Sequence, residues 1–198
     1  MRFVVGDEVD QLLVKVIVHE FSRCQLAFNL FISSKNRKYI NIMKSNLELD
    51  LMTYNAYALF LQHLYEYFQG CIKRDIRDTS NVPHETIDAL INNEVEKILR
   101  NWRQEIDNGF APKWANHRSY YEDNCPIEFG RDFRNIRNNL AHVDYRRING
   151  GNRITMTEFY KKYHKYIILL YDNGRKWWDI TQLENIELGD ITDFNKLT

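Results

Sequence analysis

Glycine, proline and cysteine are all scarce in this chain of 198 residues, which contains eight Gly, three Pro and three Cys. Because Gly and Pro most often interrupt helices, their scarcity favours long helices. Cys24, Cys71 and Cys125 are odd in number and far apart, and no two of them form a C-x-x-C spacing. Neither a disulfide framework nor a zinc ribbon is therefore predicted, and a reducing compartment is expected.

Net charge and long hydrophobic runs are also absent. Lys plus Arg and Asp plus Glu both total 27, so any binding to nucleic acid must depend on a local patch. The apolar run YIILLY at 166–171 is far too short to cross a bilayer. Acidic residues precede the first apolar run, which Lys15 interrupts, so no signal peptide is predicted. We expect a soluble cytoplasmic protein that has no membrane partner.

Apolar residues are plentiful, at 44% of the chain, with 14% aromatic residues, so a full core is expected. Their spacing of three and four residues predicts an all-α fold, a compact bundle of about five helices. We expect this helical domain to cover 1–178. The remaining segment, 179–198, has five acids and one Lys, and is expected to be packed or partly flexible.

The expected helices follow from this spacing and from the positions of the interrupting residues. They cover 7–31, about 40–74, a segment from after TSNVPHE (79–85) to about 106, a helix from about 126, and about 156–172. A basic break, SSKNRK at 33–38, is expected between the first two, a loop at 108–125, and a short hairpin-like turn near 146–155. Ser80 or Asn81 is expected to cap the third helix and Pro83 to begin its first turn. In the first helix we expect a partly interrupted apolar face, marked by Leu12, Leu13, Val16, Ile17, Glu20, Leu26 and Leu30.

The fourth helix has two different faces when its residues are placed at 100° intervals. The apolar face contains Phe129, Phe133, Ile136, Leu140 and Val143, which predicts packing on a core. The opposite face contains Arg131, Arg134, Asn138, His142 and Tyr145, and Arg137 lies at its flank. His142 is therefore expected to point away from the core.

The polar face is basic in an otherwise neutral chain. Between Arg131 and Arg147 there are five Arg and two Asp, a local net charge of +3. A solvated surface explains such a face by itself. Guanidinium, imidazole, amide and phenol groups on one face are also suited to binding a phosphate ester, which is the interpretation that we favour.

The stretch RNNLAH, Arg137 to His142, resembles the motif of the HEPN superfamily: an Arg, a polar residue, a short spacer and a His near the end of a helix. A second Arg-to-His match, from Arg77 to His84, contains Pro83 and is not expected to lie on one continuous helix. The stretch MKSNLELDLMTYNAYALFLQHLYEYF, at 43–68, is similar to the long central helix of one HEPN branch. The likeness extends in helix order over about 8–172.

The resemblance implies a metal-independent endoribonuclease that acts as a homodimer, in toxin–antitoxin systems or antiviral defence. RNA carries its own nucleophile, the 2′-hydroxyl, so cleavage needs a proton-transfer group and a cation for the phosphate. His142 is expected to transfer the proton, Arg137 to hold the phosphate, and Asn138 to orient the ring or bind the phosphate. Candidate substrate contacts are Arg134, Tyr145, Arg146 and Arg147. No cofactor and no metal are implied.

One departure concerns the partner. HEPN toxins that pair with a nucleotidyltransferase antitoxin carry His, one residue, then Tyr, whereas this chain has HVDY at 142–145. That pairing is therefore not predicted, although an antitoxin or another regulatory protein stays open.

Two alternatives to the ribonuclease also stay open. One is a HEPN-fold module that binds RNA or nucleotide without cleavage. The other is a helical interaction domain whose acidic segment and Trp177–Trp178 pair bind a protein.

Overall fold

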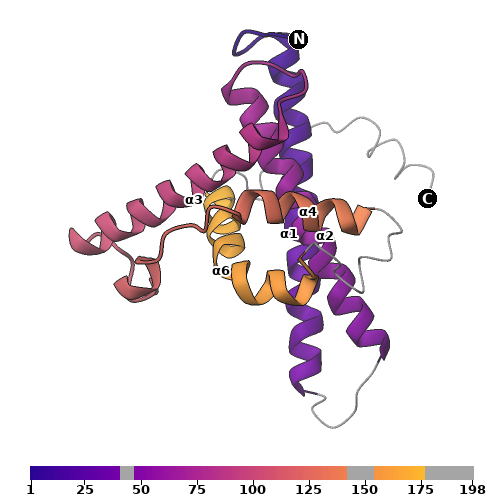
Figure 1. The fold of residues 1–198 in the computed structure, drawn as a ribbon, viewed down its shortest axis with the longest axis vertical. Coiled ribbons are helices and arrows are strands. Elements are labelled where there is room, and N and C mark those ends of the chain that lie inside the picture. The colour runs from indigo at the N-terminus through magenta and orange to yellow at the C-terminus, as the bar shows by residue number, and fades with distance from the viewer. Residues whose placement is uncertain (41–46, 142–153, 177–198) are drawn as a thin grey trace. The chain divides into compact units, whose positions relative to one another are not determined.

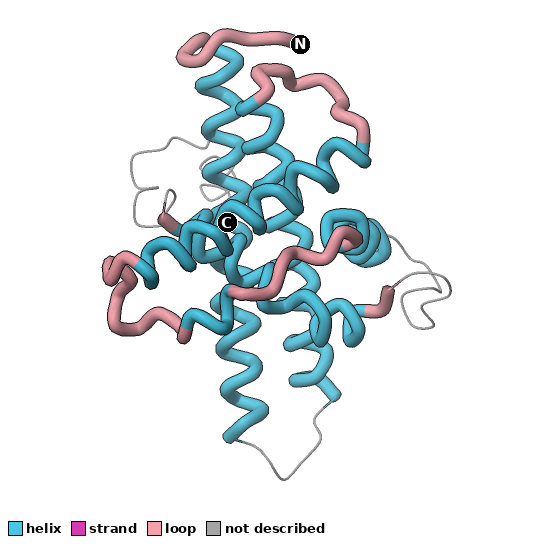
Figure 2. Tube along the Cα trace, turned by 60° about the vertical axis from the view of Figure 1, so that its left-hand side comes forward, coloured by secondary structure: helices cyan, strands magenta, loops and turns pink. Residues whose placement is uncertain are grey.

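The described part of the chain is all-α, as the sequence predicts. A computed structural model describes residues 1–40, 47–141 and 154–176. They form α1 (Glu8–Ile40), α2 (Leu47–Asp75), α3 (His84–Asp107), a 3-10 helix η1 (Arg118–Tyr121), α4 (Phe129–Ala141) and α6 (Met156–Arg175) (Figure 1). These residues contain no strand (Figure 2), and one isolated antiparallel bridge joins Arg2 to Asp78. Almost all of the turn predicted near 146–155 lies outside them.

The chain divides into two compact units. The first includes Met1–Asn81, with α1 and α2, and the second is Val82–Gly174, with α3, η1, α4 and all but the last residue of α6. The single helical domain predicted over 1–178 stays a prediction. The acidic segment at 179–198 lies outside the described residues.

In the first unit α1 and α2 lie side by side and antiparallel (Figure 1). Near the start of α1, Asp10 accepts a hydrogen bond of 2.7 Å from Nε of Arg74, close to the end of α2. Near the other end of the pair the rings of Phe31 and Tyr57 lie 4.8 Å apart. Residues later in α1 therefore contact residues earlier in α2, which shows that the two helices are antiparallel.

Aromatic rings fill the space between these two helices. Phe28 and Phe60 have ring centroids 5.0 Å apart, and Phe21 and Tyr67 have centroids 4.7 Å apart. Tilted pairs at such distances combine apolar burial with favourable ring electrostatics. One buried polar pair lies among them: Nδ1 of His63 is 2.6 Å from Oε1 of Glu20.

Two predictions for the first helix are wrong. The basic break at 33–38 does not exist, because α1 continues through it to Ile40, which was assigned to the second helix. The segment contains neither Gly nor Pro, and Lys and Arg are good helix formers. Ser34 is buried, and Nζ of Lys35 lies 5.9 Å from the ring centroid of Phe31, one turn earlier.

The predicted apolar face of this helix is the second correction. Leu12, Val16, Leu26 and Leu30 are exposed. The side chains of α1 that are buried are Ile17, Val18, Phe21, Ser22, Cys24, Gln25, Ala27, Phe31, Ser34 and Asp10. Ile17 is the one member of the predicted set in that group. The helix therefore has two apolar sides, and the aromatic side packs on α2.

The second unit begins as predicted but with a different cap. α3 starts at His84, and Pro83 occupies the N-cap position, where its carbonyl accepts hydrogen bonds from the backbone of Thr86 and Ile87. Ser80 and Asn81 therefore do not cap the helix. Buried Ile87, Ile91, Val95, Ile98, Leu99 and Trp102 form its apolar stripe.

The remaining boundaries lie near the predicted ones. α4 begins at Phe129, three residues after Pro126, and the expected loop at 108–125 contains η1. α6 begins at Met156, where Thr155 and Glu158 form a reciprocal capping box with hydrogen bonds of 2.9 and 3.2 Å. In the described part of the chain no helix is both long and apolar enough to cross a membrane.

Candidate functional site

The apolar side of α4 is buried within the second unit, where it packs on α6, as its periodicity predicts. Phe129, Phe133 and Ile136 are buried, and Leu140 is half-buried. The ring of Phe129 lies 5.3 Å from that of Tyr163 and 5.7 Å from that of Tyr166 on α6, centroid to centroid. Val143, the last member of the predicted stripe, lies outside the described residues.

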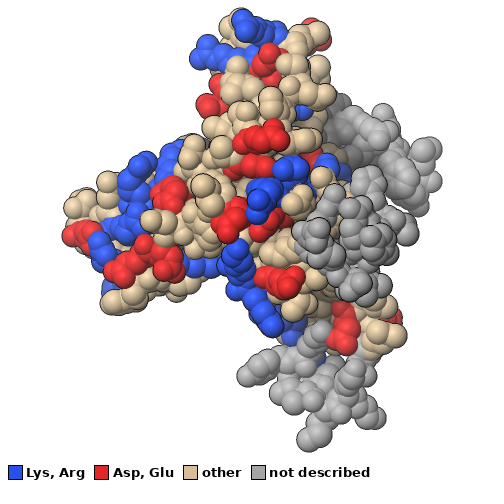
Figure 3. All heavy atoms as spheres, viewed as in Figure 1, with Lys and Arg blue, Asp and Glu red and all other residues tan. Residues whose placement is uncertain are grey.

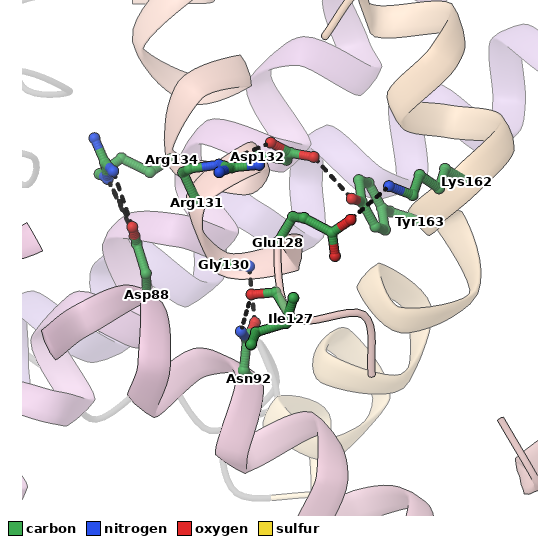
Figure 4. A network of polar contacts seen from close by, with 10 residues as sticks. All are labelled: Asp88, Asn92, Ile127, Glu128, Gly130, Arg131, Asp132, Arg134, Lys162 and Tyr163. Atoms are coloured by element: carbon green, nitrogen blue, oxygen red, sulfur yellow. Dashed lines mark hydrogen bonds and ion pairs between the residues drawn. The ribbon is translucent and has the colours of Figure 1, made fainter. Parts of the chain in front are cut away.

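Asn92 of α3 holds the first turn of α4. Its Nδ2 donates to the carbonyl of Ile127 at 2.8 Å, and its Oδ1 accepts from the backbone N–H of Gly130 at 2.8 Å (Figure 4). Gly130 is buried, and a Cβ at this position would overlap the backbone carbonyl of Asp88. Only glycine therefore permits this close approach of α4 to α3.

Arg134 contacts the same segment of α3. Its Nε and Nη2 donate to both carboxylate oxygens of Asp88 at 2.9–3.2 Å, and both side chains are mostly buried (Figure 4). Two parallel hydrogen bonds between a guanidinium and a carboxylate fix orientation as well as charge. The substrate contact predicted for Arg134 stays a prediction, and it would compete with this pair.

Asp132 connects α4 to α6 on the other side. It accepts a hydrogen bond of 2.7 Å from the hydroxyl of Tyr163 (Figure 4). Burial, together with this hydrogen bond and the negative charge of Asp132, raises the pKa of Tyr163, so the phenol remains a donor at neutral pH. Nε of Arg131 lies 3.5 Å from the second oxygen of Asp132.

Arg137 and Asn138 lie on the last turn of α4 that the structure describes. Nη1 of Arg137 donates to Oδ1 of Asn138 at 2.9 Å, and both side chains are half-buried. Nε of Arg137 is itself inaccessible to solvent, and the next residue, Asn139, is buried. The guanidinium is therefore held near the flank of the helix, as its position on the helical wheel predicts.

The structure brings together three of the seven predicted site residues: Arg134, Arg137 and Asn138 lie within two turns of one helix. The other four, His142, Tyr145, Arg146 and Arg147, lie outside the described residues. Their roles stay predictions.

Sequence reasoning did not identify Asp88, Asn92 and Tyr163, which fasten α4 to its neighbours. The available signal was weak. Asp88 directly follows Ile87 at the edge of an apolar stripe, where an acid needs a basic partner, but only the fold shows that Arg134 is that partner.

The charged side chains do not form a large area of one sign on the face in Figure 3, where basic and acidic residues alternate. Within the described ranges no three His, Cys, Asp or Glu side chains are grouped so that they could hold a metal ion.

Comparison with known proteins found no matching family model, no matching curated protein and no matching solved structure.

Proposed function

We propose that this chain is a metal-independent endoribonuclease that cleaves RNA by attack of the substrate's own 2′-hydroxyl. The observation that supports this proposal is the hydrogen-bonded pair of Arg137 and Asn138 on α4. The helix that carries the pair is held against α3 and α6, and His142 follows in sequence directly after Ala141, the last described residue of α4. The resemblance of RNNLAH to the HEPN motif supplies the reaction class.

The chemistry divides between two side chains. His142 transfers a proton, either from the 2′-hydroxyl or to the leaving 5′-oxygen, because an imidazole titrates close to neutral pH. Arg137 stabilises the charge on the phosphate through a guanidinium that stays ionised. Asn138 orients the ring of His142 or binds the phosphate, and in the structure its Oδ1 accepts a hydrogen bond of 2.9 Å from Nη1 of Arg137.

A homodimer completes this proposal. If the helix continued through the motif, Arg137 and His142 would lie about 140° apart around its axis, so one copy would present them poorly to a single phosphate. A two-fold axis beside the motif supplies one Arg and one His from each copy. Arg146 and Arg147, with Tyr145, bind the RNA backbone, and an antitoxin or regulatory protein is a further partner.

The proposal is tested by incubating the purified chain with a mixed RNA pool, with and without EDTA. We expect cleavage that EDTA does not inhibit, a cyclic phosphate on the 5′ fragment, and no cleavage where the 2′-hydroxyl is replaced by hydrogen. His142→Ala should lower the rate by about a hundredfold to ten-thousandfold. Arg137→Ala should lower it by about a hundredfold to a thousandfold.

Arg100→Ala is the matched control, because Arg100 is an exposed arginine on α3, outside the basic face of α4, and the cleavage rate of this variant should not change. Arg146→Ala combined with Arg147→Ala should weaken RNA binding and flatten its salt dependence. Binding without cleavage would support the non-catalytic module, and the absence of both would support a protein-interaction domain. Cleavage that requires a metal, or persists at full rate in His142→Ala, contradicts the mechanism.

A further inference from the structure

The loop that follows α3 carries two large aromatic side chains that are open to solvent. Phe110 is 80% exposed and Trp114 is 77% exposed. Trp is on average a highly buried residue type, so an exposed indole forgoes apolar burial that would stabilise the fold. Within the described residues, the one ring contact of these two side chains joins Trp114 to Trp102, whose ring centroids lie 5.9 Å apart. Packing in this part of the chain therefore does not explain their exposure.

Backbone hydrogen bonds fix the path of this loop. The N–H of Phe110 donates to the carbonyl of Glu105 at 2.8 Å, which ties the loop to the end of α3. The N–H of Ala115 donates to the carbonyl of Pro112 at 2.9 Å and closes a turn that contains Trp114. An aromatic ring on a loop that is already fixed binds a ligand with little loss of conformational entropy.

Trp114 is the outermost of three aromatic residues that contact one another in sequence. We call Trp114, Trp102 and Tyr121 the aromatic shelf. Trp102 stacks on Tyr121, with centroids 5.3 Å apart and planes inclined by 14°, and both residues are buried. Nη1 of Arg103 also holds the carbonyl of Tyr121 at 2.7 Å. The two buried rings thus support Trp114, whose indole leaves a flat apolar surface open to a planar ligand.

The charges around the aromatic shelf balance. Residues 102–122 contain three basic and three acidic side chains, Arg103, Lys113, Arg118, Glu105, Asp107 and Glu122. Arg118 binds both Asp107 and Glu122, at 2.7 and 3.0 Å. A phosphate group is therefore not attracted by an excess of positive charge. The ligand that fits is flat and uncharged, and a nucleobase of single-stranded RNA has both properties.

We propose that Trp114 stacks on a base of single-stranded RNA, so that the aromatic shelf is an RNA contact separate from the basic face of α4. The choice of RNA as the ligand rests on the proposed function. The indole N–H of Trp114 donates to no residue in the described ranges, so it can also donate to a base. Stacking on an aromatic side chain is tolerant of sequence, because every base has a flat face.

The aromatic shelf lies far from the proposed catalytic residues within the second unit (Figure 1). Gly130 contacts Asn92, and one turn later in α4 Arg134 contacts Asp88, one turn earlier in α3. The two helices therefore run in opposite directions where they touch. From this contact Trp102 lies about 15 Å along α3, and the last described turn of α4 lies about 16 Å the other way. A base on the shelf thus adds affinity without touching the reacting phosphate.

Binding of labelled RNA to the full chain tests the stacking, in a His142→Ala background so that the strand is not cut. The strand has about 20 nucleotides, enough to span both sites. Trp114→Ala should raise the Kd by about fivefold to 150-fold, the loss expected for one stacked base. Trp114→Phe should keep most of the affinity, because a flat ring remains. Fluorescence anisotropy measures the Kd.

The salt dependence separates stacking from charge. Trp114→Ala should leave the slope of affinity against salt unchanged, because an indole carries no charge, whereas Arg146→Ala with Arg147→Ala should flatten it. In the chain with His142 intact, Trp114→Ala should raise the KM for cleavage and leave kcat unchanged.

Ile127→Ala is the matched control, because Ile127 is an 88% exposed apolar residue of the same unit and has no ring. Its Kd should not change, and all variants should keep the helical circular-dichroism spectrum. An unchanged Kd in Trp114→Ala would overturn this inference, even where the intact chain cleaves RNA. A raised Kd without cleavage by the intact chain would support the inference and contradict the proposed function. Equal losses in Trp114→Ala and Trp114→Phe, or no RNA binding at all, would overturn the inference, and the latter would leave the shelf to a protein partner.

Discussion

The α1–α2 pair and α4 are held in place by different means. Along α1 and α2, tilted ring pairs repeat over several turns, from Phe21 with Tyr67 to Phe31 with Tyr57. α4 is a short helix of 13 residues, and polar contacts fix it at definite points, including Asp88 with Arg134 and Asp132 with Tyr163. Distributed apolar packing gives stability, whereas directional hydrogen bonds give orientation. The helix that carries the proposed motif is thus held by directional hydrogen bonds in addition to the ring packing of Phe129 on Tyr163.

The largest expected loss of unfolding free energy follows from removing one aromatic ring from between α1 and α2. Phe60 is fully buried, and its ring contacts those of Phe28 and Tyr57. Phe60→Ala should lower the free energy of unfolding by about 3–5 kcal/mol, because it removes apolar burial and leaves a cavity. Urea denaturation followed by circular dichroism measures this. Phe110→Ala, at a ring that is 80% exposed, should change it by less than about 0.5 kcal/mol. Equal effects at the two positions would contradict the packing described for α1 and α2.

An intermediate effect is expected when α4 loses its carboxylate partner on α3. Asp88→Ala should lower the free energy of unfolding by about 2–3 kcal/mol, because it leaves a mostly buried guanidinium without this carboxylate. A double-mutant cycle with Arg134→Ala isolates the coupling between the two side chains. The exposed pair of Asp107 and Arg118 is the control, and Asp107→Ala should lower the free energy of unfolding much less than Asp88→Ala, because solvent screens an exposed ion pair. If the cycle gives no coupling, Asp88 does not fix α4 through Arg134.

The smallest expected effect on the free energy of unfolding comes from removing the hydroxyl of Tyr163 while keeping its ring. Tyr163→Phe keeps the ring packing against Phe129 and removes the hydrogen bond to Asp132, so it should cost about 1 kcal/mol. The same unfolding measurement applies, and Asp132→Asn in the Tyr163→Phe background should add little. If Tyr163→Phe lowered the free energy of unfolding as much as Phe60→Ala, the hydrogen bond to Asp132 would not be a small contribution separate from the ring packing.

The helices could be predicted from the sequence because their apolar spacing is regular. The start of α6 at Met156 and the burial of Phe129 and Phe133 follow directly from it. The start of α3 after Pro83 follows from the conformation that proline fixes. These features depend on local sequence alone, which explains why they were predicted closely.

The first helix was predicted less well because it has two apolar sides. Periodicity cannot show which of them packs within the unit. It favours the aliphatic side with Leu12 and Val16, whereas the aromatic side packs on α2. The basic segment at 33–38 resembled a break by composition, but no residue in it prevents a helix.

The candidate site was predicted only in part, since the motif on α4 is local and its supports are not. Arg137 and Asn138 are neighbours in sequence, so their pairing needs no knowledge of the fold. Asp88 and Arg134 are 46 positions apart, and many other acids in the chain were possible partners. Such pairs are decided by tertiary packing.

Gly130 places a limit on how this sequence can change. Since any Cβ there meets the backbone of Asp88 rather than a side chain, no substitution elsewhere on the surface of α3 makes room for it. Replacing Gly130 by any other residue would require α4 to move away from α3. The hydrogen bonds from Gly130 to Asn92 and from Arg134 to Asp88 would then be lost. Several positions on two helices are thus expected to change together or not at all, because the absence of one Cβ couples residues that are 38 to 46 positions apart in the sequence.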